Sequence, residues 1–263
     1  MNALRRPHRI GLVVPSSNTT MEGEVPELLR RQQRGSGARF TLHSARLPLP
    51  HATPEALARM SEAADGAVDL LCDAEVDAIM YACLLATMHG GRPCILETQA
   101  RLAARAASTD RKEPAIVTSA GALVEALQWL NASQVTLVAP YRKAQTAEVA
   151  ATLAECGIRV VQSRSLEVVD NGEVGRLDPD KLLRLASQLD YSGSDALVLS
   201  ACVQMPSLEV IDQAERTLGL PVLSVATASV FALLNALGVE PAIDDAGTLL
   251  RSPDHLHRAP ALP

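Results

Sequence analysis

A short segment that occurs twice limits what this chain can fold into. Asp77-Ala-Ile-Met-Tyr-Ala-Cys83 lies in the first half, and a near copy, Asp195-Ala-Leu-Val-Leu-Ser-Ala-Cys202, lies in the second. In each copy, apolar or small residues follow a single aspartate, which predicts a strand covered on both faces, and a helix is expected after each cysteine. Open parallel sheets bind ligands at the carboxyl ends of such strands. The repeat therefore predicts two thiols that meet in one crevice.

The order of the predicted strands and helices also repeats. Strands are expected at residues 10–15, 39–45, 77–82, 114–118, 135–139, 159–162, 195–201 and 221–225. Helices are expected at residues 26–32, 54–71, 96–107, 119–130 and 179–189, from about 206, and at 228–237. This alternation predicts an α/β fold with two similar lobes, whose parallel sheets are flanked by helices and related by a pseudo-two-fold axis. We expect the active site in the cleft between lobes 1–130 and 131–250, and a flexible tail at 251–263.

Two helix starts in the first half have local signals. Thr53 before Pro54 predicts an N-cap followed by proline at the first helical position. Thr19 and Glu22 have the spacing of a capping box, and Pro26 is interpreted as the opening of the next helix.

Composition and charge exclude several classes of protein. At 263 residues and 48% hydrophobic content, the chain is long enough for one large or two small domains with a sizeable core. Because the formal net charge is −6, aromatic residues make up 2%, and lysine and arginine do not cluster, we expect no nucleic-acid partner. The apolar stretch at 10–15 is too short for a secretory signal, and polar residues interrupt the longest apolar segment, 222–239. We therefore expect no membrane span and a cytoplasmic protein.

The five cysteines differ in their surroundings. They are an odd set without a Cys-x-x-Cys pair, which argues against disulfides and against a metal site. Cys72, Cys94 and Cys156 are interpreted as small buried hydrophobic residues. Cys83 and Cys202 each stand at a strand-to-helix junction, where the N–H groups of a helix start favour a thiolate.

Five separated segments carry a more specific signal. They are Pro15-Ser-Ser-Asn18-Thr-Thr20, Tyr81-Ala-Cys83-Leu, Ala139-Pro-Tyr141, Asn171-Gly-Glu-Val-Gly-Arg176 and Ser200-Ala-Cys202-Val-Gln-Met-Pro206. In this order they resemble segments of maleate cis-trans isomerases, a family of the aspartate/glutamate racemase superfamily that also includes arylmalonate decarboxylase. The resemblance spans about residues 9–240.

The resemblance implies a set of site residues. Cys83 would be the nucleophile, with Cys202 opposite it, and the side chains of Asn18, Tyr141 and Asn171 would hold the substrate carboxylates. Backbone N–H groups and apolar wall residues would complete the substrate site: Ser16, Ser17, Leu84, Leu85, Val203 and Met205. The resemblance also implies a homodimer, no cofactor, and a catabolic role in nicotinate degradation.

Three of these residues also fit a purely structural interpretation. Asn18 could cap the helix that follows it. Tyr141 could be a loop residue that packs its ring. Asn171 before Gly172 could form an ordinary turn.

The reaction that the resemblance implies is the conversion of maleate to fumarate. A carbon–carbon double bond does not rotate at a useful rate, so the enzyme must lower its bond order for a time. Addition of the Cys83 thiolate to one olefinic carbon does this, while negative charge moves into the far carboxylate as an enediolate. Cys202 then supplies or shares a proton, the central bond rotates, and elimination of Cys83 releases fumarate.

Other functions remain open at this point. Amino-acid racemases of the superfamily also use two thiols, one as base and one as acid, whereas arylmalonate decarboxylase keeps only the second thiol. The Ser-Ser-Asn18 loop and Tyr141 favour maleate. A non-enzymatic dicarboxylate-binding protein with inert cysteines is a further alternative. None of the three lysines, Lys112, Lys143 and Lys181, lies on a recognisable Schiff-base site for pyridoxal phosphate.

Overall fold

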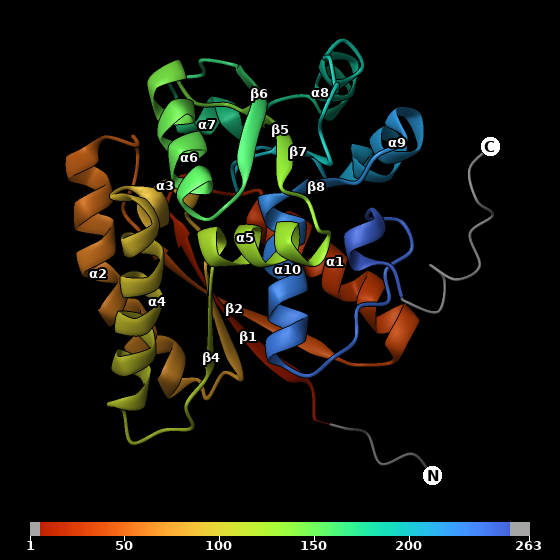
Figure 1. The fold of residues 1–263 in the computed structure, drawn as a ribbon. Coiled ribbons are helices and arrows are strands. Elements are labelled where there is room, and N and C mark those ends of the chain that lie inside the picture. Colours follow the sequence, from red (N-terminus) through yellow and green to blue (C-terminus); the bar gives the residue numbers. More distant parts are fainter. Residues whose placement is uncertain (1–5, 253–263) are drawn as a thin grey trace.

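Two parallel sheets organise the computed structural model, which describes residues 6–252 (Figure 1). Its strands are β1 (His8–Pro15), β2 (Phe40–Leu47), β3 (Ala78–Tyr81), β4 (Ala115–Thr118), β5 (Gln134–Ala139), β6 (Arg159–Ser165), β7 (Ala196–Ser200) and β8 (Val222–Ser224). The first sheet has the order β2-β1-β3-β4 and the second the order β6-β5-β7-β8. The two orders correspond strand by strand and every pairing is parallel, which confirms the predicted fold of two similar α/β lobes.

Helices follow most strands and cover the sheets. In the first half they are α1 (Met21–Ser36), α2 (Pro54–Asp73), α3 (Leu84–Met88), α4 (Gly91–Ala107) and α5 (Ser119–Trp129). In the second half they are α6 (Lys143–Glu155), α7 (Asn171–Val174), α8 (Pro179–Ala186), α9 (Leu208–Leu218) and α10 (Val225–Ala236). The central strands β1, β3, β5 and β7 are almost wholly buried, as expected for sheets covered on both faces.

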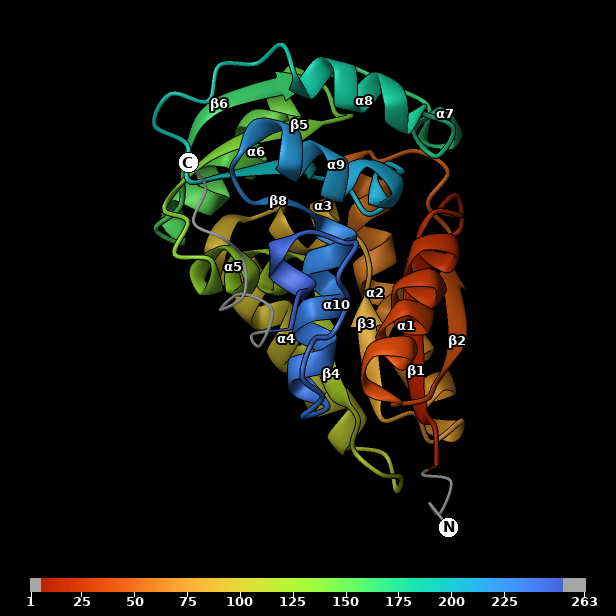
Figure 2. The ribbon, with the colours of Figure 1, turned by 90° about the vertical axis from the view of Figure 1, so that its right-hand side faces the viewer.

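Helix α10 belongs to the second half of the chain but packs mainly on the first. It contacts α5, α1, β3 and β4, and Figure 2 shows it lying along the first sheet. Its residues 225–234 are all buried, so it is apolar on every side, which is typical of a helix enclosed by protein. Because α10 comes from the second half of the chain and completes the core of the first lobe, the lobes do not separate cleanly in sequence. The lobe boundary near residue 131 stays a prediction.

Some helix starts differ from the predictions. Helix α2 begins as predicted, with Thr53 Oγ1 accepting the Ala56 N–H at 3.3 Å and Pro54 as first residue. Helix α1 begins at Met21, and Pro26 lies inside it. The predicted capping box is wrong, because Asn18 and not Thr19 supplies the cap: its Oδ1 accepts the Met21 N–H at 3.1 Å. Helix α4 likewise begins at Gly91, before the predicted residue 96.

The ends of the chain are only partly described. Residues 253–263 of the predicted tail lie outside the described residues. Arg251, the first residue of that predicted tail, is fixed by hydrogen bonding to Asp212 at 3.2 Å. Among residues 6–252, no helix combines the length and the apolar character that crossing a membrane requires.

A carboxylate of the first lobe caps a helix of the second. Glu24 Oε1 on α1 accepts the N–H groups of Ser207 at 2.7 Å and Leu208 at 2.8 Å, where α9 begins. Its Oε2 is buried without a hydrogen-bond partner. Burial raises the pKa of Glu24, and the two N–H donors oppose that shift. The cap therefore needs the acceptor oxygen more than the charge.

Replacement of Glu24 separates these two contributions. Glu24→Ala leaves two buried N–H groups without an acceptor and should lower the free energy of unfolding by about 2 kcal/mol. Glu24→Gln keeps an acceptor oxygen and removes the buried charge, so its unfolding free energy should stay within about 1 kcal/mol of the parent. Urea-unfolding midpoints at pH 7 compare the three proteins. An equal loss in both variants would contradict this account.

Candidate active site

Cys83 stands directly before helix α3, two residues after strand β3 ends. The side chain is nearly buried, with 6% of its surface exposed. The Ala86 N–H in the first turn of α3 faces the sulfur and lowers its pKa. This part of the predicted junction is present: a thiol at the carboxyl end of a buried strand, beside the start of a helix.

Cys202 occupies the corresponding place after β7, but a turn follows it instead of a helix. Ser200 Oγ holds the turn by donating to the carbonyl groups of Cys202 at 2.8 Å and Met205 at 2.9 Å. Helix α9 begins at Leu208, close to the predicted start near residue 206, so residues 203–207 separate Cys202 from the helix. The turn aims the Gln204 N–H at Cys202 Sγ, with an N···S distance of 3.4 Å. A backbone donor thus still faces the sulfur.

The two thiols and Tyr141 form one electrostatic group. Burial raises the pKa of Cys83, and the charge of an ionised Cys202 raises it further, so the two thiols are electrostatically coupled. The Tyr141 hydroxyl acts as a hydrogen-bond donor to Cys202 Sγ and lowers the pKa of that thiol. Burial raises the pKa of Tyr141, and negative charge on Cys202 or Cys83 raises it further. Residues from both sheets therefore converge at the carboxyl ends of β3, β5 and β7.

Burial has the largest effect on the ionisation of both thiols. It raises the pKa of Cys83 to about 12, and it also raises the pKa of Cys202. The backbone N–H donors lower both pKa values, in the predicted direction, but burial outweighs them. The charge of an ionised Cys202 adds to the rise in the pKa of Cys83, so the two ionisations are coupled.

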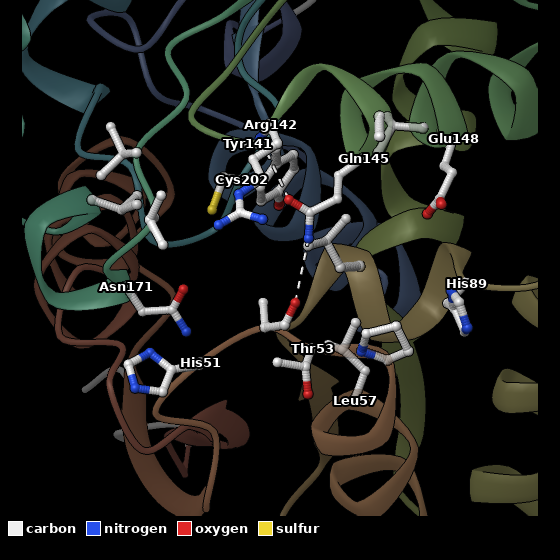
Figure 3. A pocket seen from close by; sticks show the side chains of 18 of the residues that line it. His51, Thr53, Leu57, His89, Tyr141, Arg142, Gln145, Glu148, Asn171 and Cys202 are labelled. Carbon is white, nitrogen blue, oxygen red and sulfur yellow. Dashed lines mark hydrogen bonds between the residues drawn. The ribbon is translucent and has the colours of Figure 1, made fainter.

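A cavity of about 510 Å³ opens beside Cys202 (Figure 3). Four residues of the predicted site line it: Leu85, Tyr141, Asn171 and Cys202. Cys83 is not part of the lining. The mouth is formed by residues from the loop before α2, the first turns of α6 and the end of α3: His51, Thr53, Arg142, Gln145, Glu148 and His89. The cavity is thus bounded by both lobes.

Comparison with known proteins identifies the family. A sequence model described as arylmalonate decarboxylase matches residues 10–250. The chain is 44% identical to the maleate isomerase of Geobacillus stearothermophilus over 243 residues, which are 92% of this chain and 96% of that protein. The chain belongs to the maleate isomerase family. The family resemblance read from the five sequence segments is therefore confirmed.

Solved structures agree with this family. A cysteine-to-serine variant of Nocardia farcinica maleate cis-trans isomerase with a covalently bound succinylcysteine intermediate has 42% identity and a TM-score of 0.90, over 94% of this chain and 99% of that one. A cysteine-to-alanine variant of the maleate isomerase from Pseudomonas putida S16 with maleate has 39% identity and a TM-score of 0.92, over 94% and 99%. Arylmalonate decarboxylase, at 18% identity and a TM-score of 0.71, shares the fold.

In this member of the maleate isomerase family, both polar atoms of the Asn18 side chain are hydrogen-bonded within the protein. The side chain is fully buried. Its Oδ1 caps α1, and its Nδ2 donates to the Val203 carbonyl at 3.3 Å, which ties the first lobe to the Cys202 turn. The cap interpretation of Asn18 is confirmed. A carboxylate would have to use the second hydrogen of the same amide group.

The two serines after β1 hold a neighbouring loop. The Ser16 N–H donates to the Leu47 carbonyl at 2.7 Å, and Ser16 Oγ accepts the Leu49 N–H at 3.1 Å. Ser17 Oγ donates to the Leu49 carbonyl at 2.9 Å. The Ser16 N–H is consequently engaged in the β1–β2 connection and differs from the free anion donor that the sequence predicts.

The remaining predicted residues divide between free donors and core. Within residues 6–252, the N–H groups of Leu84 and Val203 make no hydrogen bond, although both residues are buried and neither lines the cavity. Met205 is 1% exposed and packs into the core of the second sheet, which differs from its predicted place in the cavity wall. Asn171 is the first residue of α7 and not a turn residue, with Asp170 as its cap.

Gln204 links the parts of the site and was missed by the sequence analysis. It is 5% exposed and lines the cavity. Its Nε2 donates to the Ser17 carbonyl at 2.9 Å and to the Asn171 carbonyl. Its own carbonyl accepts Thr20 Oγ1 at 2.7 Å. One side chain beside the Cys202 thiol therefore fixes the first lobe and α7 to the same turn. In the sequence, only its position two residues after Cys202 could have indicated that Gln204 belongs to the site.

Proposed function

We propose that the chain isomerises maleate to fumarate through a transient adduct on Cys83. The observation that carries the proposal is the convergence of two thiols, one from each sheet, on the Tyr141 hydroxyl beside a cavity. The relatives support it. One holds a succinylcysteine, in which a carbon–sulfur bond has formed and the olefin has become a single bond, and another holds maleate.

The first step is addition of a thiolate to the double bond. Cys83 is the nucleophile, since the Ala86 N–H at the start of α3 favours its anion over that of an ordinary buried thiol. Its sulfur forms a bond to one olefinic carbon, and the π electrons move through the other carbon into its carboxylate. The product is an enediolate whose central bond is single. Covalent addition thus replaces a high rotational barrier by lower ones.

The second step is a proton transfer from Cys202. Burial raises the pKa of Cys202, which favours its neutral thiol, and in this proposal it keeps its proton until the adduct has formed. Cys202 gives its proton to the carbanionic carbon and becomes a thiolate, to which Tyr141 donates a hydrogen bond. After rotation, Cys202 removes that proton again, the carbon–sulfur bond breaks, and Cys83 leaves as a thiolate. Protons and electrons balance over the cycle.

The donors near the thiols fit the two carboxylates of the substrate. The N–H groups of Leu84 and Val203 stand next to the two cysteines, and Asn171 lines the cavity. The Asn171 Nδ2 donates to the Leu49 carbonyl at 3.3 Å, so in this proposal it exchanges that acceptor for a substrate carboxylate. Hydrogen bonds from such groups stabilise an enediolate more than a carboxylate, since the negative charge grows as the adduct forms. Asn18 would act through its remaining amide hydrogen. In this proposal Tyr141 supports Cys202 and also contacts the substrate.

Incubation with maleate tests the proposal. Purified protein in the presence of a chelator should produce fumarate, followed by proton NMR of the olefinic signals. Aspartate and glutamate of each hand serve as parallel substrates, because two facing thiols also suit a racemase. Racemisation without fumarate formation would assign the chain to that class. Binding of maleate without turnover of any of these compounds would leave a dicarboxylate-binding protein.

The raised pKa of Cys83 predicts an alkaline activity profile. A thiol with a raised pKa is almost wholly protonated at pH 7, so its thiolate fraction grows about tenfold per pH unit below the pKa. The iodoacetamide reactivity of Cys83 should therefore titrate above the ordinary thiol value of 9.0. In Cys202→Ser the neighbouring charge is lost, and the titration should move to lower pH. Mass-spectrometric rates from pH 6 to pH 11 measure both. An unchanged midpoint would contradict the coupling.

Three finer statements rest on the resemblance alone. We propose that the protein acts as a homodimer, in the cytoplasm, and in the degradation of nicotinate or related rings. Light scattering of the purified protein tests the first of these.

A further inference from the structure

The mouth of the cavity carries a guanidinium group without a protein partner. Arg142 directly follows Tyr141, is exposed and lines the cavity. Within residues 6–252 its guanidinium makes no ion pair and no hydrogen bond, whereas Arg46, Arg101 and Arg105 each pair with a carboxylate. In Figure 3 the Arg142 side chain points into the cavity. Its charge is therefore free to act on whatever enters.

The other charges at the mouth do not cancel it locally. The Glu148 carboxylate also lines the cavity, but Figure 3 places it near His89, away from Arg142. Lys143 is the next residue and is exposed, but it is not part of the lining. The chain as a whole has a formal net charge of −6, which repels an approaching anion. A dianion thus needs a local cation to become concentrated at this opening.

We propose that Arg142 recruits the anionic substrate at the cavity mouth and makes the site selective for dianions over neutral compounds. It is a recruiting residue and not a catalytic one, because its expected contact is with the carboxylates outside the thiol pair. The identity of the anion as maleate rests on the proposed function. The attraction of anions to the cavity mouth by Arg142 does not depend on that function.

Two alkylating reagents measure the attraction without any assumption about the reaction. Iodoacetate is an anion and iodoacetamide is neutral, and both transfer the same kind of group to a thiolate with loss of iodide. The ratio of their rates at Cys202, measured by mass spectrometry, cancels changes in the reactivity of the thiol itself. The proteins compared are the parent, Arg142→Gln, Arg142→Lys and the matched control Lys143→Gln, which removes the same charge one residue away.

The expected result is specific to Arg142. At about 20 mM salt, Arg142→Gln should lower the iodoacetate-to-iodoacetamide ratio about threefold, and at about 500 mM salt the difference should vanish. Arg142→Lys should keep most of the ratio, and Lys143→Gln should change it little. The local concentration of an anion depends exponentially on its charge. For the doubly charged maleate, kcat/KM should therefore fall by about the square of the threefold change, near tenfold, mainly through a higher KM.

Each outcome decides one of the two proposals. An unchanged ratio in Arg142→Gln, or an equal change in Lys143→Gln, would overturn the role of Arg142, since only total charge would then matter. A changed ratio in a protein that does not isomerise maleate would keep anion recruitment and reject the proposed reaction. Equal melting temperatures of the four proteins serve as the folding control, because the Arg142 side chain has no partner to lose.

Discussion

Replacement of Cys83 by alanine is expected to lower the rate of maleate isomerisation by about 10⁴-fold or more, as removal of a nucleophile does in other covalent enzymes. Without the sulfur, no adduct forms, and the double bond keeps its full order. Neither Cys202 nor the N–H donors can compensate, since they act only on an enediolate that no longer arises. The measurement is kcat at saturating maleate and alkaline pH, with the loss of maleate monitored over time.

A second cysteine variant controls for general effects of thiol removal. Cys156 lies outside the cavity and is half-buried, so Cys156→Ala should keep the parental kcat. The loss of one small side chain at Cys83 should leave the protein folded, which a thermal melt verifies. Parental activity in Cys83→Ala would remove the covalent mechanism altogether, whereas loss of activity in both variants would point to instability.

The two-lobe fold was predictable because each buried strand has an apolar pattern that can be recognised in its own short segment. A strand buried on both faces is expected to be apolar, as residues 78–81 and 196–199 are. Two such segments at matching positions, each preceded by an aspartate, are difficult to explain without a structural repeat. Both aspartates accept backbone N–H groups of a neighbouring segment. Asp77 accepts the Arg9 N–H, and Asp195 accepts the N–H groups of Ser133 and Gln134.

Helix starts were predicted less well because proline was given too much weight. Proline is favoured in the first turn of a helix, so Pro26 was interpreted as the beginning of α1. The actual start is set by Asn18, whose side chain reaches the Met21 N–H across three residues. A cap can outweigh proline because it satisfies a buried N–H group.

The cavity mouth could not be predicted because its residues share no sequence pattern. His51 and Thr53 come from a loop, whereas Arg142 and Gln145 come from the start of α6. The two segments meet where the Gln145 Nε2 donates to the Ala52 carbonyl at 3.3 Å, a contact between residues far apart in the chain (Figure 3). The lining of a site between two lobes is a property of their packing, which a single sequence does not display.

Replacement of Cys202 should give the second large effect, and of a different kind. In Cys202→Ala the thiolate of Cys83 can still add to maleate, but the enediolate has lost its proton donor, and kcat should fall about 10²- to 10⁴-fold. Protonation by water then yields a succinyl group on Cys83, and without the Cys202 thiolate no base removes the proton again. The adduct should accumulate where the parent protein turns over.

Intact-mass spectrometry after incubation with maleate should show one added maleic acid on Cys202→Ala, mapped to the peptide that contains Cys83. The double variant Cys83→Ala/Cys202→Ala is the control and should gain no mass. The same experiment on Cys83→Ala tests which thiol attacks: an adduct on Cys202 in that variant, with none on Cys83 in Cys202→Ala, would reverse the two roles. The Gln204 N–H of the turn and the Tyr141 hydroxyl that follows β5 both act on Cys202, and we expect no reversal because both donors stabilise a thiolate that has just given up its proton.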